Sequence, residues 1–173
     1  MTIPNWLSAS RYLLAPCICI AILTNTWLVA TSLFLLAIIT DILDGWLATK
    51  LSSVSAIGGL LDHSADAFLV GTILGTLSYL KVIPWILPIL LISAFLQYVL
   101  DSNALQGKTL RTNRLGRYNG FGYYILSAIS LIQTSMNWQV FSAPSIYYLG
   151  WGLVLTTLIS MTERAALLWL TRR

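Results

Sequence analysis

The stretch DILDGWLATKLSSVSAIGGLLDHSAD, residues 41–66, holds four of the six acidic residues of the chain. The other two are Asp101 and Glu163. The 173-residue chain is 57% hydrophobic and only 9% charged, whereas about 25% of the residues of an ordinary soluble domain are charged. The composition therefore indicates a membrane protein, in which a carboxylate within apolar sequence is costly and usually functional.

Long apolar runs around this stretch predict an all-α, polytopic fold. Residues 82–100 and 118–162 carry no charge, and residues 12–49 carry none apart from Asp41 and Asp44. A spanning helix needs about 20 apolar residues, so we expect six transmembrane helices, at 5–26, 30–50, 57–80, 82–101, 117–136 and 146–169. They form a single membrane domain over residues 1–173, whose only long connection is 101–117.

The basic residues predict the orientation of these helices. With six spans and both termini on one side, nine of the ten basic residues lie on that side, and only Lys81 lies on the other. The positive-inside rule then places both termini in the cytoplasm. We expect a multi-pass protein of the inner (cytoplasmic) membrane with its active site facing the cytoplasm. Because the basic residues are spaced between apolar runs, the net charge of +4 does not indicate a nucleic-acid partner.

The four clustered carboxylates are expected to converge. Asp41 and Asp44 are three residues apart near the end of the second helix, and Asp62 and Asp66 are four apart at the start of the third, so each pair shares a helix face. A short connection makes the two helices an antiparallel hairpin. Four ionised carboxylates would repel one another, so either cations bind between them or some are protonated. Oxygen ligands favour hard cations, and two such ions suit phosphoryl transfer.

The spacing of these residues resembles the signature of the CDP-alcohol phosphatidyltransferase family, D-x2-D-G-x2-A-R-x8-G-x3-D-x3-D. The chain matches seven of the eight fixed positions of this signature, with every gap correct: Asp41, Asp44, Gly45, Ala48, Gly58, Asp62 and Asp66. Residues 4–11, PNWLSASR, also resemble the P-N-x-L-[ST]-x-x-R opening of such enzymes.

The resemblance implies a metal-dependent transferase of phospholipid biosynthesis. It would move a phosphatidyl group from a CDP-diacylglycerol-type lipid to a small polar alcohol and release CMP. By position, Asp41, Asp44 and Asp62 hold two divalent cations, Mg²⁺ or Mn²⁺, while Asp66 takes the proton of the acceptor hydroxyl and serves as a fourth metal ligand. The residues implied to border the CDP-lipid are Asn5, Gly45, Ala48, Thr49 and Gly58.

Two positions depart from the family pattern. Thr49 stands where the family has a basic residue, and the adjacent Lys50 is turned about 100° around the helix, so the diphosphate loses a cationic partner. The segment Asp62–Ala67, DHSADA, also differs from the D-P-x-A-D-K that is common in members using glycerol phosphate.

The longest connection carries basic residues every three positions, Lys108, Arg111, Arg114 and Arg117. One interpretation is orientation and contact with lipid headgroups. The other is an acceptor-phosphate site, because some family members use phosphorylated alcohols. The acceptor-binding residues predicted on that basis are Lys108, Arg114 and Arg117.

Alternatives to this function remain at the sequence level. Intramembrane carboxylates also carry cations or protons through transporters, although here all four lie near one membrane face. An inactive family member is a third interpretation, indicated only by Thr49. The small-residue pattern Gly71-x3-Gly75 fits either close packing within the bundle or a homodimer contact.

Overall fold

The computed structural model describes residues 3–50, 55–102 and 114–171, and this part of the chain is all helical. Its six helices are α1 (Ile3–Leu23), α2 (Trp27–Lys50), α3 (Ala56–Tyr79), α4 (Ile86–Asp101), α5 (Arg114–Ser135) and α6 (Ala143–Thr171). They match the six expected segments to within a few residues. The predicted all-α fold is therefore confirmed for the described residues.

The largest difference in bounds is at α4, which begins at Ile86 rather than at residue 82. Lys81 adopts a left-handed φ of 59°, and Pro84 has no N–H to continue a helix and restricts the residue before it. The chain therefore turns over residues 80–85 and enters α4 after the proline, where the Leu87 N–H already donates to the Pro84 carbonyl.

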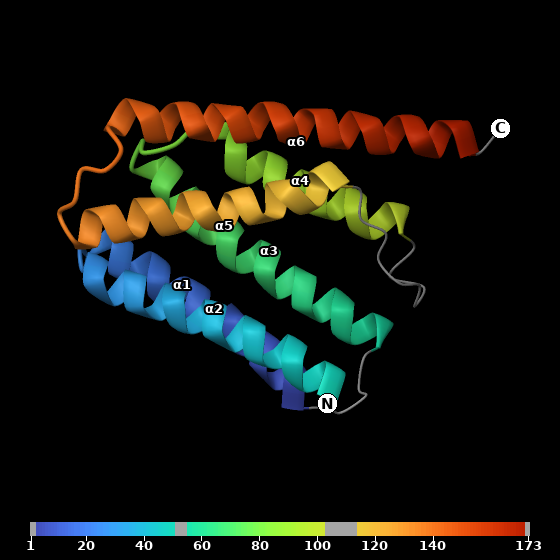
Figure 1. Cartoon of the computed structure of the whole chain (residues 1–173), viewed down its shortest axis with the longest axis horizontal. Helices are drawn as coiled ribbons and strands as arrows, with labels where there is room; N and C mark the ends of the chain where they lie inside the picture. Colours follow the sequence, from blue (N-terminus) through green and yellow to red (C-terminus); the bar gives the residue numbers. More distant parts are fainter. Residues whose placement is uncertain (1–2, 51–54, 103–113, 172–173) are drawn as a thin grey trace.

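Three tight connections join the helices at one end of the bundle. Each contains a residue with positive φ, Asn25 between α1 and α2, Lys81 between α3 and α4, and Asn137 between α5 and α6. Figure 1 shows these connections together at one end and both chain termini toward the other. The helices therefore alternate in direction, which is the up-and-down order that the sequence predicts.

Side chains are distributed as in a protein that faces lipid. Large apolar residues lie on the outside, such as Leu13 and Ile57, which are 74% and 73% exposed. The interior contains polar side chains, including Ser8, Arg11 and Asp44, beside apolar residues such as Phe34. A bilayer accepts this arrangement because lipid tails solvate the outer apolar surface and leave polar groups to pair inside.

Within the part of the chain that the structure describes, four helices contain segments long and apolar enough to cross a membrane: Trp6–Leu23, Trp27–Leu47, Ile57–Tyr79 and Ala143–Leu167. They lie in α1, α2, α3 and α6. Helix α4 is also apolar but has only 16 residues. A multi-pass membrane protein is thus supported, while spanning by α4 and α5 and the cytoplasmic orientation stay predictions.

Helix packing divides the bundle into two halves that share α3. On one side, α1 packs against α2 and α3; on the other, α6 packs against α4 and α5, and α5 also contacts α2 and α3. Gly71 lies in α3 opposite α4, where an added Cβ would stand 3.0 Å from Ile92 Cδ1. This glycine therefore serves helix packing within one chain.

Candidate functional site

The four clustered aspartates meet between α2 and α3, as the spacing predicts. Carboxylate oxygens of Asp41, Asp44 and Asp62 lie within 4.8 Å of one another. Asp66 follows Asp62 by one turn of α3 and faces the same centre. The side chain of Asp44 is almost fully buried, at 5% exposed, whereas those of Asp41, Asp62 and Asp66 are partly open.

A buried arginine from α1 lies at the centre of this cluster. The guanidinium of Arg11, which is 0% exposed, forms ion pairs with all four carboxylates. Nη1 donates to Asp41 and Asp66, and Nη2 donates to Asp62 and, at 2.8 Å, to Asp44. The two terminal nitrogens carry four hydrogens, so each hydrogen is matched by one carboxylate.

Two hydroxyl groups, one from α1 and one from α5, donate hydrogen bonds to the carboxylates of the cluster. Ser8, one turn before Arg11, donates to Asp44 Oδ2 at 2.8 Å and contacts Asp62 Oδ1 at 3.4 Å. From α5, the Tyr124 hydroxyl donates to Asp66 Oδ1 at 2.8 Å. Helices α1 and α5 therefore orient carboxylates that are carried on α2 and α3.

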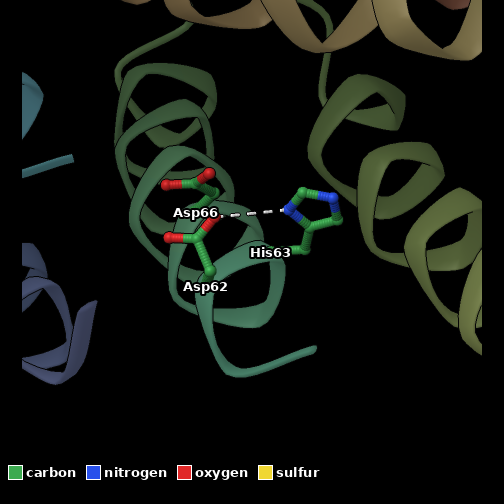
Figure 2. Close-up of side chains that lie close together, drawn as sticks. All are labelled: Asp62, His63 and Asp66. Atoms are coloured by element: carbon green, nitrogen blue, oxygen red, sulfur yellow. Dashed lines mark ion pairs between the residues drawn. The ribbon is translucent and has the colours of Figure 1, made fainter. Parts of the chain in front are cut away.

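His63 lies on the other side of Asp62. Its Nδ1 is 3.6 Å from Asp62 Oδ2, and Figure 2 shows the imidazole beside Asp62 and Asp66, with its ring directed toward the neighbouring helix. There it stacks on the Tyr98 ring of α4, with centroids 5.9 Å apart. Asp62, His63 and Asp66 form a second group of side chains close enough to share a metal ion.

The donor set suits hard divalent cations. The group of Asp41, Asp44 and Asp62 offers oxygen atoms alone, which is the chemistry that Mg²⁺ and Mn²⁺ prefer. The partly open side chains of Asp41 and Asp62 leave these oxygens accessible from outside the bundle. Four carboxylates against one guanidinium also leave three negative charges for cations to balance.

Four of the residues expected to border a CDP-lipid, Gly45, Ala48, Thr49 and Gly58, belong to the facing ends of α2 and α3, and Asn5 belongs to the start of α1. Gly45 leaves open space where a side chain would be. The Thr49 hydroxyl donates to the Gly45 carbonyl at 3.0 Å, and the Gly58 N–H donates to the helix cap Ser55 at 3.0 Å. The side chains of Asn5 and Ala48 lie outside the described ones.

A cavity of about 560 Å³ opens next to Asp66, between α3, α4, α5 and α6. Its lining includes His63, Tyr124, Arg117 and Arg164, together with apolar side chains such as Leu91 and Phe95. Of the basic residues predicted to bind the acceptor, Arg117 lines this cavity, whereas Arg114 is exposed at the start of α5 and is not part of the lining. Lys108 lies outside the described residues.

Arg164 of α6 ties Asp101 to the wall of this cavity. Its Nε donates to Asp101 Oδ2 at 3.3 Å, and its guanidinium lies 4.9 Å from the centre of the Tyr98 ring. Asp101, which had no firm role in the sequence, thus orients an arginine beside the cavity. The side-chain oxygens of Gln97 and Tyr98 in the same wall are buried and have no partner among the described residues.

Sequence reasoning missed three residues of this site, Arg11, Tyr124 and Arg164. Arg11 and Arg164 both fall inside expected spans, at 5–26 and 146–169, where an ionisable side chain indicates function. Arg11 also ends the motif at residues 4–11, but neither signal shows which side chains the two arginines contact. Tyr124 is one of eight tyrosines and carries no comparable signal.

Comparisons with known proteins agree with this geometry. Human cardiolipin synthase (CMP-forming) is 35% identical over 119 residues, which cover 68% of this chain and 40% of the human protein. CDP-diacylglycerol–glycerol-3-phosphate 3-phosphatidyltransferase 1 of Arabidopsis thaliana is 28% identical over 174 aligned residues, 88% of this chain and 59% of that protein. CDP-diacylglycerol–glycerol-3-phosphate 3-phosphatidyltransferase of Aquifex aeolicus is 39% identical over 79 residues, which cover 46% of this chain and 43% of that protein.

The matched region thus covers 40% to 59% of the length of these relatives. The family model for CDP-alcohol phosphatidyltransferases matches residues 1–168. It spans both the carboxylate cluster and the cavity beside it. The chain therefore belongs to the CDP-alcohol phosphatidyltransferase family.

Proposed function

We propose that the protein transfers a phosphatidyl group from CDP-diacylglycerol to a small polar alcohol and releases CMP. The observation that carries the proposal is the position of Asp66, which belongs to the carboxylate cluster and also lines the cavity. A nucleotide-lipid bound at the carboxylates and an alcohol bound in the cavity would meet at this residue.

The carboxylates divide into two roles. Asp41, Asp44 and Asp62 would hold two divalent cations, Mg²⁺ or Mn²⁺, with Asp66 as a further ligand. When bound, these cations supply positive charge for the diphosphate and for the departing CMP. Gly45, Thr49 and Gly58, with Asn5 and Ala48, would border the CDP-lipid. The open space at Gly45 supports close approach of a ligand to the α2 backbone.

Asp66 would accept the proton of the acceptor. The alcohol oxygen attacks the phosphorus that carries diacylglycerol, the bond from that phosphorus to the bridging oxygen breaks, and CMP leaves with the electron pair. The hydroxyl proton passes to Asp66. Arg11 and Tyr124 both donate to Oδ1, so among the described contacts Oδ2 is the oxygen left to receive it.

The acceptor is proposed to carry a phosphate group. Arg117 and Arg164 line the cavity, and guanidinium groups bind phosphate oxygens well. The names of the relatives include glycerol 3-phosphate for the Arabidopsis and Aquifex proteins, and cardiolipin with release of CMP for the human protein. We extend the acceptor site to Arg164 alongside the sequence-based Lys108, Arg114 and Arg117.

The membrane setting is part of the proposal. We infer six spans, both termini in the cytoplasm, and an active site facing the cytoplasmic side of the inner membrane. The distribution of basic residues supports this orientation. A homodimer also stays a prediction.

Release of CMP with formation of a new lipid tests the proposed reaction. Purified protein in detergent or vesicles would receive CDP-diacylglycerol, Mn²⁺ or Mg²⁺, and one acceptor at a time: glycerol 3-phosphate, phosphatidylglycerol, inositol phosphate, serine or choline. We expect one acceptor to give both products and Asp66→Asn to lose at least about 100-fold in rate. Asp101→Asn, a carboxylate outside the cluster, is the matched control and should retain CMP release at saturating acceptor.

Two results would contradict the proposal. One is an absence of CMP with every acceptor, and the other is an Asp66→Asn rate equal to that of the wild type. The transporter alternative makes a different prediction, cation or proton flux in sealed vesicles without CDP-lipid. The placement of all four carboxylates around one guanidinium, rather than along a path through the bundle, favours the transferase.

A further inference from the structure

Arg11 is the most enclosed charged group of the described chain, and the proposed transfer reaction does not require it. Its side chain is 0% exposed, and all four of its terminal N–H groups point to carboxylates on two other helices. An arginine that served orientation alone would extend to the membrane surface. Arg11 instead turns inward, toward the residues that would hold metal ions.

The pairing uses one oxygen of each carboxylate. Arg11 contacts Oδ1 of Asp41, Asp62 and Asp66 and Oδ2 of Asp44. Arg11 does not contact the second oxygen of any of the four aspartates, so these oxygens can bind another cation. A lysine could not reproduce this pattern, because its ammonium has only three N–H donors at one point, whereas a guanidinium presents a rigid planar fork.

We propose that Arg11 is an internal counter-cation, a positioning residue that holds the four carboxylates together before divalent ions bind. Without a cation, carboxylates this close in a membrane interior would separate or become protonated. Arg11 balances one of the four charges and orients all four groups, so the metal site is assembled in the metal-free protein. The proposal rests on the proposed function only for the identity of the ions.

The same geometry weakens metal binding. A guanidinium within hydrogen-bond distance of every metal ligand repels an incoming divalent cation. Arg11 therefore makes the metal-free fold more stable and the metals easier to release. The ions should bind tightly only when a diphosphate brings further negative charge, which couples metal binding to the presence of the nucleotide-lipid.

The test compares thermal stability with and without metal, and needs no transfer activity. Wild type, Arg11→Met and Arg11→Lys would be purified in Mn²⁺, stripped with EDTA, and melted with and without Mn²⁺ while tryptophan fluorescence is followed. Methionine keeps the apolar stem of the arginine and removes its charge. We expect Mn²⁺ to raise the Tm of Arg11→Met by several degrees more than that of the wild type, with Arg11→Lys between them.

Mn²⁺ binding, measured by the electron paramagnetic resonance of free Mn²⁺, should be roughly tenfold tighter in Arg11→Met because a nearby positive charge is gone. CMP, which brings phosphate charge, should tighten Mn²⁺ binding in the wild type more than in the variant. Arg164→Met is the matched control, since Arg164 pairs with Asp101, a carboxylate outside the cluster. Its Tm should fall by the same amount with and without Mn²⁺.

Equal losses of Tm in Arg11→Met with and without Mn²⁺ would overturn the proposal, since a packing role alone predicts that result. Weaker Mn²⁺ binding in Arg11→Met would overturn it as well. If Arg11→Met does not fold in EDTA but folds in Mn²⁺, the proposal is supported. Absence of Mn²⁺ binding to the wild type would instead contradict the metal assignment of the proposed function.

Discussion

The two halves of the bundle that share α3 are built in opposite ways. On the α1–α2 side, four carboxylates surround one buried guanidinium, and each carboxylate forms an ion pair with it. On the α4–α6 side, Arg117 and Arg164 border a cavity with a largely apolar wall. The first half suits binding of metal and diphosphate, where charges must be matched closely. The second suits an alcohol that must enter and leave.

Asp66 belongs to both halves. Its carboxylate is held by Arg11 from α1 and by Tyr124 from α5, and its side chain borders the cavity. We therefore expect substitutions on the α1–α2 side to affect the chemical step and its metal dependence. Substitutions on the α4–α6 side should affect acceptor binding.

The largest effect is expected for Asp44→Asn. Asp44 is the most buried of the four carboxylates, and the change removes a charged oxygen from the proposed metal site while keeping its shape. Loss of several kcal/mol of charge stabilisation corresponds to a fall in kcat of about 10³-fold. Steady-state CMP release checks this result.

Asp101→Asn is the counterpart of Asp44→Asn in the other half. It should raise the acceptor KM, because Arg164 loses the carboxylate that orients it, and should change the KM of the CDP-lipid little. If both variants lowered kcat to a similar extent, the division of the bundle into two functional halves would be wrong.

The next effect concerns the cavity. Arg117→Ala removes a cation from its lining and should raise the KM for a phosphorylated acceptor about 10- to 100-fold, the value of a hydrogen bond to a charged group. The KM for CDP-diacylglycerol should stay near that of the wild type. Initial rates with each substrate varied in turn measure both constants.

Arg114→Ala is the matched comparison, since Arg114 lies one turn earlier on α5 but outside the cavity lining. Its effect on the acceptor KM should be smaller. Equal effects of the two variants on both substrates would indicate that these arginines contact lipid headgroups rather than the acceptor.

A smaller effect is expected at the boundary between the halves. Tyr124→Phe removes the hydroxyl that donates to Asp66 Oδ1 and should lower kcat about tenfold, without weakening acceptor binding. Tyr123→Phe is a close control, because the neighbouring hydroxyl pairs with Thr157 rather than with the carboxylate cluster. We expect kcat of that control to stay near the wild-type value, and a loss equal to that of Tyr124→Phe would argue for a packing role.

The two halves also differ in how well the sequence predicts them. The hairpin of α2 and α3 and the convergence of its aspartates follow from spacing alone, because 3.6 residues per turn places Asp41 with Asp44 and Asp62 with Asp66. The helix order follows from the apolar runs. Helix α4 begins at Ile86, later than its apolar run predicts, because hydropathy does not show where the turn at Lys81 and Pro84 ends.

Contacts between distant helices could not be read in this way. These contacts join residues at least 30 positions apart in the sequence: Arg11 with the four carboxylates, Tyr124 with Asp66, and Arg164 with Asp101. Such contacts depend on how the helices rotate against one another, which periodicity leaves open. The cavity wall depends on such contacts, as between Arg164 and Asp101, so periodicity predicts this half less well.

The smallest effect concerns the one position where the motif on the α1–α2 side is incomplete. Thr49→Arg restores the basic residue of the family signature at an exposed site in the last turn of α2. A cation there is favoured by the helix dipole and could reach the diphosphate. Because the site is exposed, the gain should be only about two- to fivefold in the KM for CDP-diacylglycerol.

Thr49→Gln, which lengthens the side chain without adding charge, isolates the electrostatic part of this gain. The acceptor KM should not change in either variant, since the residue belongs to the half that binds the nucleotide-lipid. If Thr49→Arg lowers the KM for CDP-diacylglycerol and Thr49→Gln does not, a further positive charge at this position strengthens binding of the diphosphate. An unchanged KM would instead indicate that the divalent ions already supply all the charge that the diphosphate requires.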